Sequence, residues 1–126
     1  MENVCVMSHA SDIDGVGSAA LIRMRYGVPL KRIFFADYST ESLDYVDSKL
    51  KPLYGSGITL FITDLGTNES LVAEYRSIID AVRKGGGRVI WFDHHPWPAQ
   101  AVLGSSIGNL MPTFCRHLAI ARRANR

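Results

Sequence analysis

The 126-residue chain is 47% hydrophobic and 21% charged, with a formal net charge of +2, which is the composition of one soluble globular domain. It contains no apolar run near the roughly 20 residues of a membrane-crossing helix and no secretory signal pattern, so we expect a cytoplasmic protein without a membrane partner. Its two cysteines, Cys5 and Cys115, have no CxxC spacing and are weak evidence for a disulfide or a zinc site.

Predicted strands and helices alternate along the chain. Short apolar runs predict strands over Val4–Ser8, Arg32–Ala36, Ile58–Thr63 and Arg88–Phe92. The helices between them are expected from after Asp14 to about Gly27, from a cap at Ser39 or Thr40 to about Leu50, and from a cap at Asn68 to Gly85. This alternation predicts an α/β fold: a mostly parallel sheet with helices on both faces, in three layers α/β/α.

The end of the chain differs in composition. Residues 104–109 (GSSIGN) predict a loop or linker, and residues 113–123 are a candidate helix. No acidic residue follows Asp93, and the later charged side chains, histidine aside, are Arg116, Arg122, Arg123 and Arg126. We therefore expect a domain over 1–103 and a linker with a basic helix or tail over 104–126. The arginines are a weak nucleic-acid signal, and a solvated helix end also explains them.

Polar side chains follow every predicted strand. Parallel strands end at one edge of a sheet, where open α/β folds bind their ligands. The residues expected there are His9, Asp12 and Asp14 after the first strand, Asp37 after the second, Asp64 after the third, and Asp93, His94 and His95 after the fourth. Gathered carboxylates would repel one another without cations, and carboxylates mixed with imidazoles suit Mn²⁺ or a similar ion. The pattern therefore predicts a metal site.

Each residue also has a simpler interpretation when taken alone. Asp12 or Asp14 would serve as a helix cap, and Asp64 would serve to end a strand. For Asp37 we favour local hydrogen bonding at the start of the second helix. Gly15 and Gly17 would either allow a close backbone approach or form a flexible turn. It is the combination of residues that favours a metal site.

Three motifs resemble those of the DHH phosphoesterase superfamily, which includes RecJ-type exonucleases, oligoribonucleases, nucleotide phosphatases, pyrophosphatases and exopolyphosphatases. They are His9-x-x-Asp12-x-Asp14-Gly15, Asp64 in FITDLG, and Asp93-His94-His95 in WFDHHP, and the match spans residues 3 to about 98. The resemblance implies a catalytic domain with two divalent metal ions, usually Mn²⁺, with Mg²⁺ as the alternative.

The resemblance also implies a role for each motif residue. His9 and Asp12 would hold one ion, Asp14 and His94 the other, and Asp64 would bridge both and take part in catalysis. Asp93 would bind metal or orient His94. His95 would act as a catalytic residue that contacts the substrate phosphate or the leaving group.

The chain departs from the family pattern downstream. The family supplies a fourth motif, an aspartate after DHH, and a smaller C-terminal domain that grips the substrate, and these 126 residues contain neither. We expect a fragment of a longer protein or an altered end, with completion by a partner chain or by His117 as less favoured alternatives.

Three functions stay open at this stage. We favour an Mn²⁺-dependent phosphoesterase or exonuclease that acts on single-stranded oligonucleotides or small nucleotides. The alternatives are an inorganic pyrophosphatase or polyphosphatase of the same superfamily, and a non-catalytic remnant that binds metal or nucleic acid.

Overall fold

The computed structural model describes residues 3–95, which form an α/β fold. The linker and helix expected after residue 103, with the four arginines, Cys115 and His117, lie outside the described residues. The strands are β1 (Val4–His9), β2 (Ile33–Ala36), β3 (Thr59–Thr63) and β4 (Arg88–Phe92). The helices are α1 (Ile13–Tyr26), α2 (Thr40–Leu50) and α3 (Val72–Lys84), with short 3₁₀ helices η1 (Leu30–Arg32) and η2 (Lys51–Ser56).

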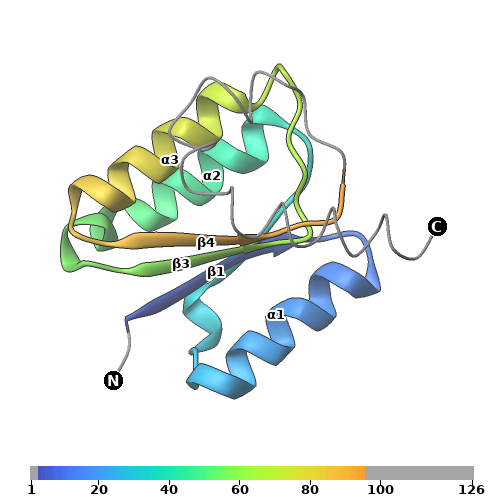
Figure 1. Cartoon of the computed structure of the whole chain (residues 1–126), viewed down its shortest axis with the longest axis horizontal. Helices are drawn as coiled ribbons and strands as arrows, with labels where there is room; N and C mark the ends of the chain where they lie inside the picture. The colour runs from blue at the N-terminus through green and yellow to red at the C-terminus, as the bar shows by residue number, and fades with distance from the viewer. Residues whose placement is uncertain (1–2, 96–126) are drawn as a thin grey trace.

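The four strands form one all-parallel sheet in the order β2-β1-β3-β4. Helix α1 covers one face, and α2 and α3 lie together on the other (Figure 1). The larger core lies between the sheet and α2/α3, with Trp91 and Tyr75 fully buried there. The smaller core, around Val6 and Phe61, lies beneath α1. The predicted three-layer arrangement is confirmed, and no helix among residues 3–95 is long and apolar enough to cross a bilayer.

Local signals in the sequence explain how the first two helices begin and how the first one ends. Asp12 caps α1 by accepting a 2.9 Å hydrogen bond from the Gly15 N–H. Gly27 ends that helix at φ 65°, a left-handed conformation that glycine adopts without steric cost. Ser39 caps α2 by accepting from the Ser42 N–H.

The prediction that Asn68 caps the third helix is wrong. Helix α3 begins at Val72, after a turn that leads through Leu71, and it has no side-chain cap. The Asn68 side chain accepts from the N–H and hydroxyl of Ser70. Asparagine forms such local turns as readily as it caps helices, and here the turn precedes the helix.

The strand order places a topological switch point between the ends of β1 and β3. These strands are neighbours in the sheet, yet the chain leaves β1 towards α1 on one face and leaves β3 towards α3 on the other (Figure 1). In open α/β sheets such a switch point is where ligands bind. The residues after β1 and β3, with those after the neighbouring β4, therefore form the candidate site.

Candidate metal centre

Asp64 stands at the middle of the site, directly after β3. Its side chain is buried, with 5% of the residue exposed, and its N–H donates to the Phe92 carbonyl at 2.9 Å. Its φ is 54°, the one positive φ at a non-glycine residue between positions 3 and 95. Aspartate tolerates this conformation better than most residues do, and backbone strain of this kind gathers at functional sites.

One group of potential ligands joins Asp64 to the residues after β1. His9 Nδ1 lies 3.1 Å from Asp12 Oδ2 and 3.7 Å from Asp64 Oδ2. One ligand atom of each of the three residues lies within 4.8 Å of the others. Asp12 serves two purposes, because its Oδ1 caps α1 while its Oδ2 faces His9. The capping and metal-site interpretations of Asp12 are therefore compatible.

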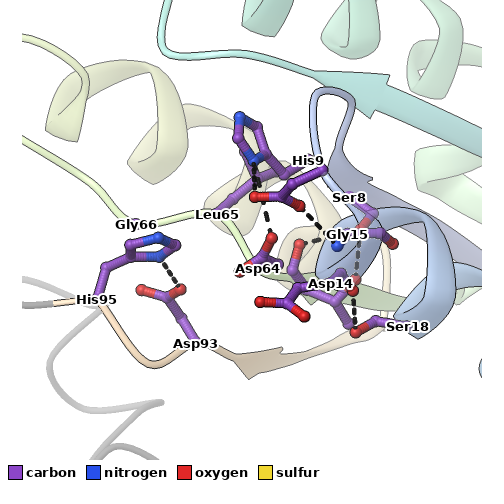
Figure 2. A network of polar contacts seen from close by, with 12 residues as sticks. Ser8, His9, Asp14, Gly15, Ser18, Asp64, Leu65, Gly66, Asp93 and His95 are labelled. Carbon is purple, nitrogen blue, oxygen red and sulfur yellow. Dashed lines mark hydrogen bonds and ion pairs between the residues drawn. The ribbon is translucent and has the colours of Figure 1, made fainter.

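A second group joins Asp64 to the residues after β4. His94 Nε2 lies 3.0 Å from Asp64 Oδ1. His95 Nδ1 lies 2.5 Å from Asp93 Oδ1, the contact drawn between these two residues in Figure 2. Asp64, Asp93, His94 and His95 each present a ligand atom within 4.8 Å of the others. Asp64 belongs to both groups. Its Oδ2 faces His9 at the end of β1, and its Oδ1 faces His94, which follows β4.

Asp14 lies in neither group. It occupies the first turn of α1 beside Asp64 (Figure 2). Together with Asp64, Asp93 and His94 it lines an open depression of about 410 Å³, which also has apolar walls from α1 and β4. The structure thus brings Asp14 to the edge of the site predicted for it, but without a ligand atom inside either compact group.

The donor set fits a divalent ion. Asp64 Oδ2 is a buried oxygen that accepts no hydrogen bond from the described residues, although such atoms are nearly always satisfied. Burial, and then the neighbouring Asp12 carboxylate, raise the pKa of Asp64. The Gly15 N–H bond, above all, lowers the pKa of Asp12. Carboxylates that crowd a buried oxygen, together with imidazoles, form a ligand set that suits a divalent metal ion.

Buried polar contacts hold the strand ends in place beneath these ligands. The Thr63 hydroxyl donates to Ser8 Oγ at 2.8 Å, and the Ser8 hydroxyl donates to the Gly15 carbonyl at 2.7 Å. A Cβ at Gly15 would collide with the His9 carbonyl, whereas one at Gly17 would meet open space. The close approach is therefore to the His9 backbone at Gly15, whereas no described atom crowds Gly17, which lines the depression.

Two residues after β2 play different parts. Asp37 makes the local contacts expected of it, since its Oδ1 accepts from the Ser39 N–H at 2.9 Å. Tyr38, which the sequence reasoning missed, lies against the site: its ring centroid is 5.3 Å from that of His9 and 6.3 Å from that of His95. Its position just after a strand, as for the aspartates and histidines, was the available signal.

Comparison of the chain with protein-family models, with curated proteins and with solved structures found no match.

Proposed function

We propose that the chain is the catalytic lobe of a two-metal phosphoesterase of the DHH type, which hydrolyses phosphodiester bonds in single-stranded oligonucleotides or small nucleotides. The observation that carries this proposal is the position of Asp64. One buried carboxylate belongs to two groups of potential ligands, with His9 on one side and His94 on the other. A carboxylate placed in this way suits a pair of neighbouring ions better than a single one.

His9, Asp12 and Asp64 would hold one ion, and Asp64, Asp93 and His94 the other, with Asp14 at the edge of the second. Bound there, two divalent ions supply a water of lowered pKa and neutralise charge on the phosphoryl oxygens. The chain contributes the rigid placement of their ligands. Asp64 is fixed by its backbone bond to β4, and the following residue, Leu65, accepts a 2.8 Å bond from the Trp91 indole.

The His95–Asp93 pair suits a proton donor. Asp93 is 4% exposed and its Oδ1 lies 2.5 Å from His95 Nδ1, which leaves Nε2 of His95 for the substrate. A carboxylate that accepts from Nδ1 fixes the tautomer and the orientation of an imidazole. His95, once protonated on both ring nitrogens, would give the proton on Nε2 to the leaving oxygen, become neutral, and regain a proton from solvent before the next turnover.

The test is Mn²⁺-dependent hydrolysis by the 126-residue chain, beside a longer protein that contains it where one exists. The substrates are a short single-stranded oligonucleotide and inorganic pyrophosphate. Asp64→Asn is the inactivating variant, and Asp44→Asn, the same change at an exposed position of α2, is its control.

Release of mononucleotides that requires Mn²⁺ and is lost only in Asp64→Asn supports the proposal. Hydrolysis of pyrophosphate alone would replace it with the pyrophosphatase alternative. Mn²⁺ binding without hydrolysis of either substrate, in the chain and in the longer protein alike, would leave a metal-binding module.

A further inference from the structure

Tyr38 spans the candidate site from one flank to the other. It follows β2, and its hydroxyl oxygen accepts a 3.2 Å hydrogen bond from the N–H of Gly66, which follows β3. Strand β1 lies between β2 and β3 in the sheet, so this bond passes over the end of β1, where His9 lies. The ring contact with His9 agrees with that path.

Tyr38 also lies against His95, the last residue of the Asp93-His94-His95 motif. Its ring meets that of His95 at an interplanar angle of 84°. Gly66 packs beneath the same histidine, because a Cβ there would lie 2.9 Å from His95 Cβ and 3.4 Å from Asp93 Oδ2. The Tyr38 hydroxyl is thus anchored beside both groups of potential metal ligands.

Among the described residues of the site, hydrogen-bond acceptors outnumber the donors left for a ligand, which include Nε2 of His95. The carboxylates only accept, and three histidine nitrogens already face carboxylates: Nδ1 of His9, Nε2 of His94 and Nδ1 of His95. The Gly66 N–H is taken up by Tyr38. A tyrosine hydroxyl carries one proton besides its lone pairs, and within residues 3–95 no acceptor receives the proton of Tyr38. The residue is 41% exposed, so a ligand can reach it.

We propose that the Tyr38 hydroxyl donates a hydrogen bond to a phosphoryl oxygen of the substrate, which makes Tyr38 a substrate-binding residue. This inference rests on the proposed function, since it requires a phosphate at the metal centre. The bond accepted from Gly66 fixes the oxygen and strengthens the hydroxyl as a donor, because linked hydrogen bonds polarise one another.

The test separates the hydroxyl from the ring and from metal binding. Tyr38→Phe removes the hydroxyl and keeps the ring beside His9 and His95. Tyr45→Phe makes the same change at an exposed position of α2. Calorimetry on the 126-residue chain measures Mn²⁺ alone, and then thymidine 5′-monophosphate at saturating Mn²⁺.

We expect Tyr38→Phe to bind Mn²⁺ within about twofold of the wild type and the nucleotide about tenfold more weakly, since hydrogen bonds to charged groups are stronger than those between neutral groups. Tyr45→Phe should match the wild type in both. In the unaltered chain, nucleotide with Mn²⁺ should protect Tyr38, and not Tyr45, from nitration by tetranitromethane, a measurement that does not depend on how a variant folds.

Unchanged nucleotide affinity in Tyr38→Phe, or nitration of Tyr38 at the same rate with nucleotide bound, would overturn the inference and leave the proposed function standing. A parallel loss of Mn²⁺ binding would overturn it as well, because Tyr38 would then act through the placement of His9. If the wild type takes up Mn²⁺ but no nucleotide, the inference and the proposed function are both wrong.

Discussion

Replacing Asp64 with asparagine should stabilise the metal-free chain while it removes metal binding. The carboxylate is buried, its Oδ2 accepts no hydrogen bond within residues 3–95, and Asp12 lies close by. Asparagine has the same shape, tolerates the φ of 54° at this position, and carries no charge. The amide of asparagine can also donate a hydrogen bond to the Asp12 carboxylate. In the wild type the carboxylates of Asp12 and Asp64 are both acceptors and repel each other.

The magnitude follows from the buried oxygen. An unsatisfied buried polar group costs about 1–3 kcal/mol, and we expect Asp64→Asn to recover about 1–2 kcal/mol, since the bond from His94 to Oδ1 is weakened by the change. In a domain of this size that corresponds to a rise of about 4–8 °C in the Tm of the metal-free protein. By contrast, Mn²⁺ at 100 times its Kd should stabilise the wild type by about 2.7 kcal/mol.

Thermal melts with chelator and with Mn²⁺ test whether Asp64→Asn gains stability without metal and loses the stabilisation by Mn²⁺. The variant should melt higher than the wild type without metal and lower with it, whereas Asp44→Asn should follow the wild type under both conditions. A lower metal-free Tm in Asp64→Asn would show that its carboxylate stabilises the fold, and a Mn²⁺-induced rise equal to that of the wild type would remove Asp64 from the metal centre.

The dependence on pH gives the same prediction a second form. Burial and Asp12 raise the pKa of Asp64, so the folded state favours the protonated form. The destabilisation caused by the ionised Asp64 carboxylate is therefore absent below the pKa of about 3.9 in the unfolded chain. It grows as the pH rises through the higher pKa of Asp64 in the folded state. The metal-free Tm of wild type and Asp64→Asn should converge near pH 3.5 and separate towards pH 7.

Three other results are expected. His95→Ala should leave Mn²⁺ binding intact in calorimetry but slow oligonucleotide hydrolysis about 100-fold; loss of Mn²⁺ binding would make His95 a metal ligand. Gly15→Ala should lower the Tm steeply because its Cβ meets the His9 carbonyl, and Gly17→Ala, which meets open space, should not; equal melting points would contradict the close approach. Cys5 is fully buried, and burial raises its pKa, so peptide mapping should find it unlabelled by iodoacetamide until the chain is unfolded.

The strands were predictable because the sheet is covered on both faces. A strand buried on two sides needs a continuous apolar run, and the run predicted over Val4–Ser8 became β1 over Val4–His9. The second and third strands each begin one residue later than predicted. Helix ends depend on which of several hydrogen bonds a polar side chain makes. The sequence predicted the helix-capping bond of Ser39 correctly. For Asn68 it predicted a cap, whereas the side chain bonds to Ser70 in a turn.

The convergence of the site residues was predictable, but their individual geometry was not. Parallel strands alone imply that His9, Asp64 and Asp93 gather at one edge. Asp12 both caps α1 and faces His9, and Asp64 adopts a left-handed backbone conformation. Both features depend on the three-dimensional arrangement of the strand ends, which the spacing of residues in the sequence does not encode. Tyr38 was missed because its contacts cross β1, and the order of strands across the sheet is not written in any local pattern.

That strand order is also what allows Asp64 to be shared. Strand β3 lies between β1 and β4, so the residue at its end has His9 on one side and His94 on the other. At either edge of the sheet, β3 would have only one neighbouring strand and Asp64 would belong to only one of the two groups. A slip of β3 by one residue against its partners would turn the side chain at this position to the opposite face. The pairing of Thr63 with Ser8 and with Phe92 therefore fixes both candidate metal positions at once.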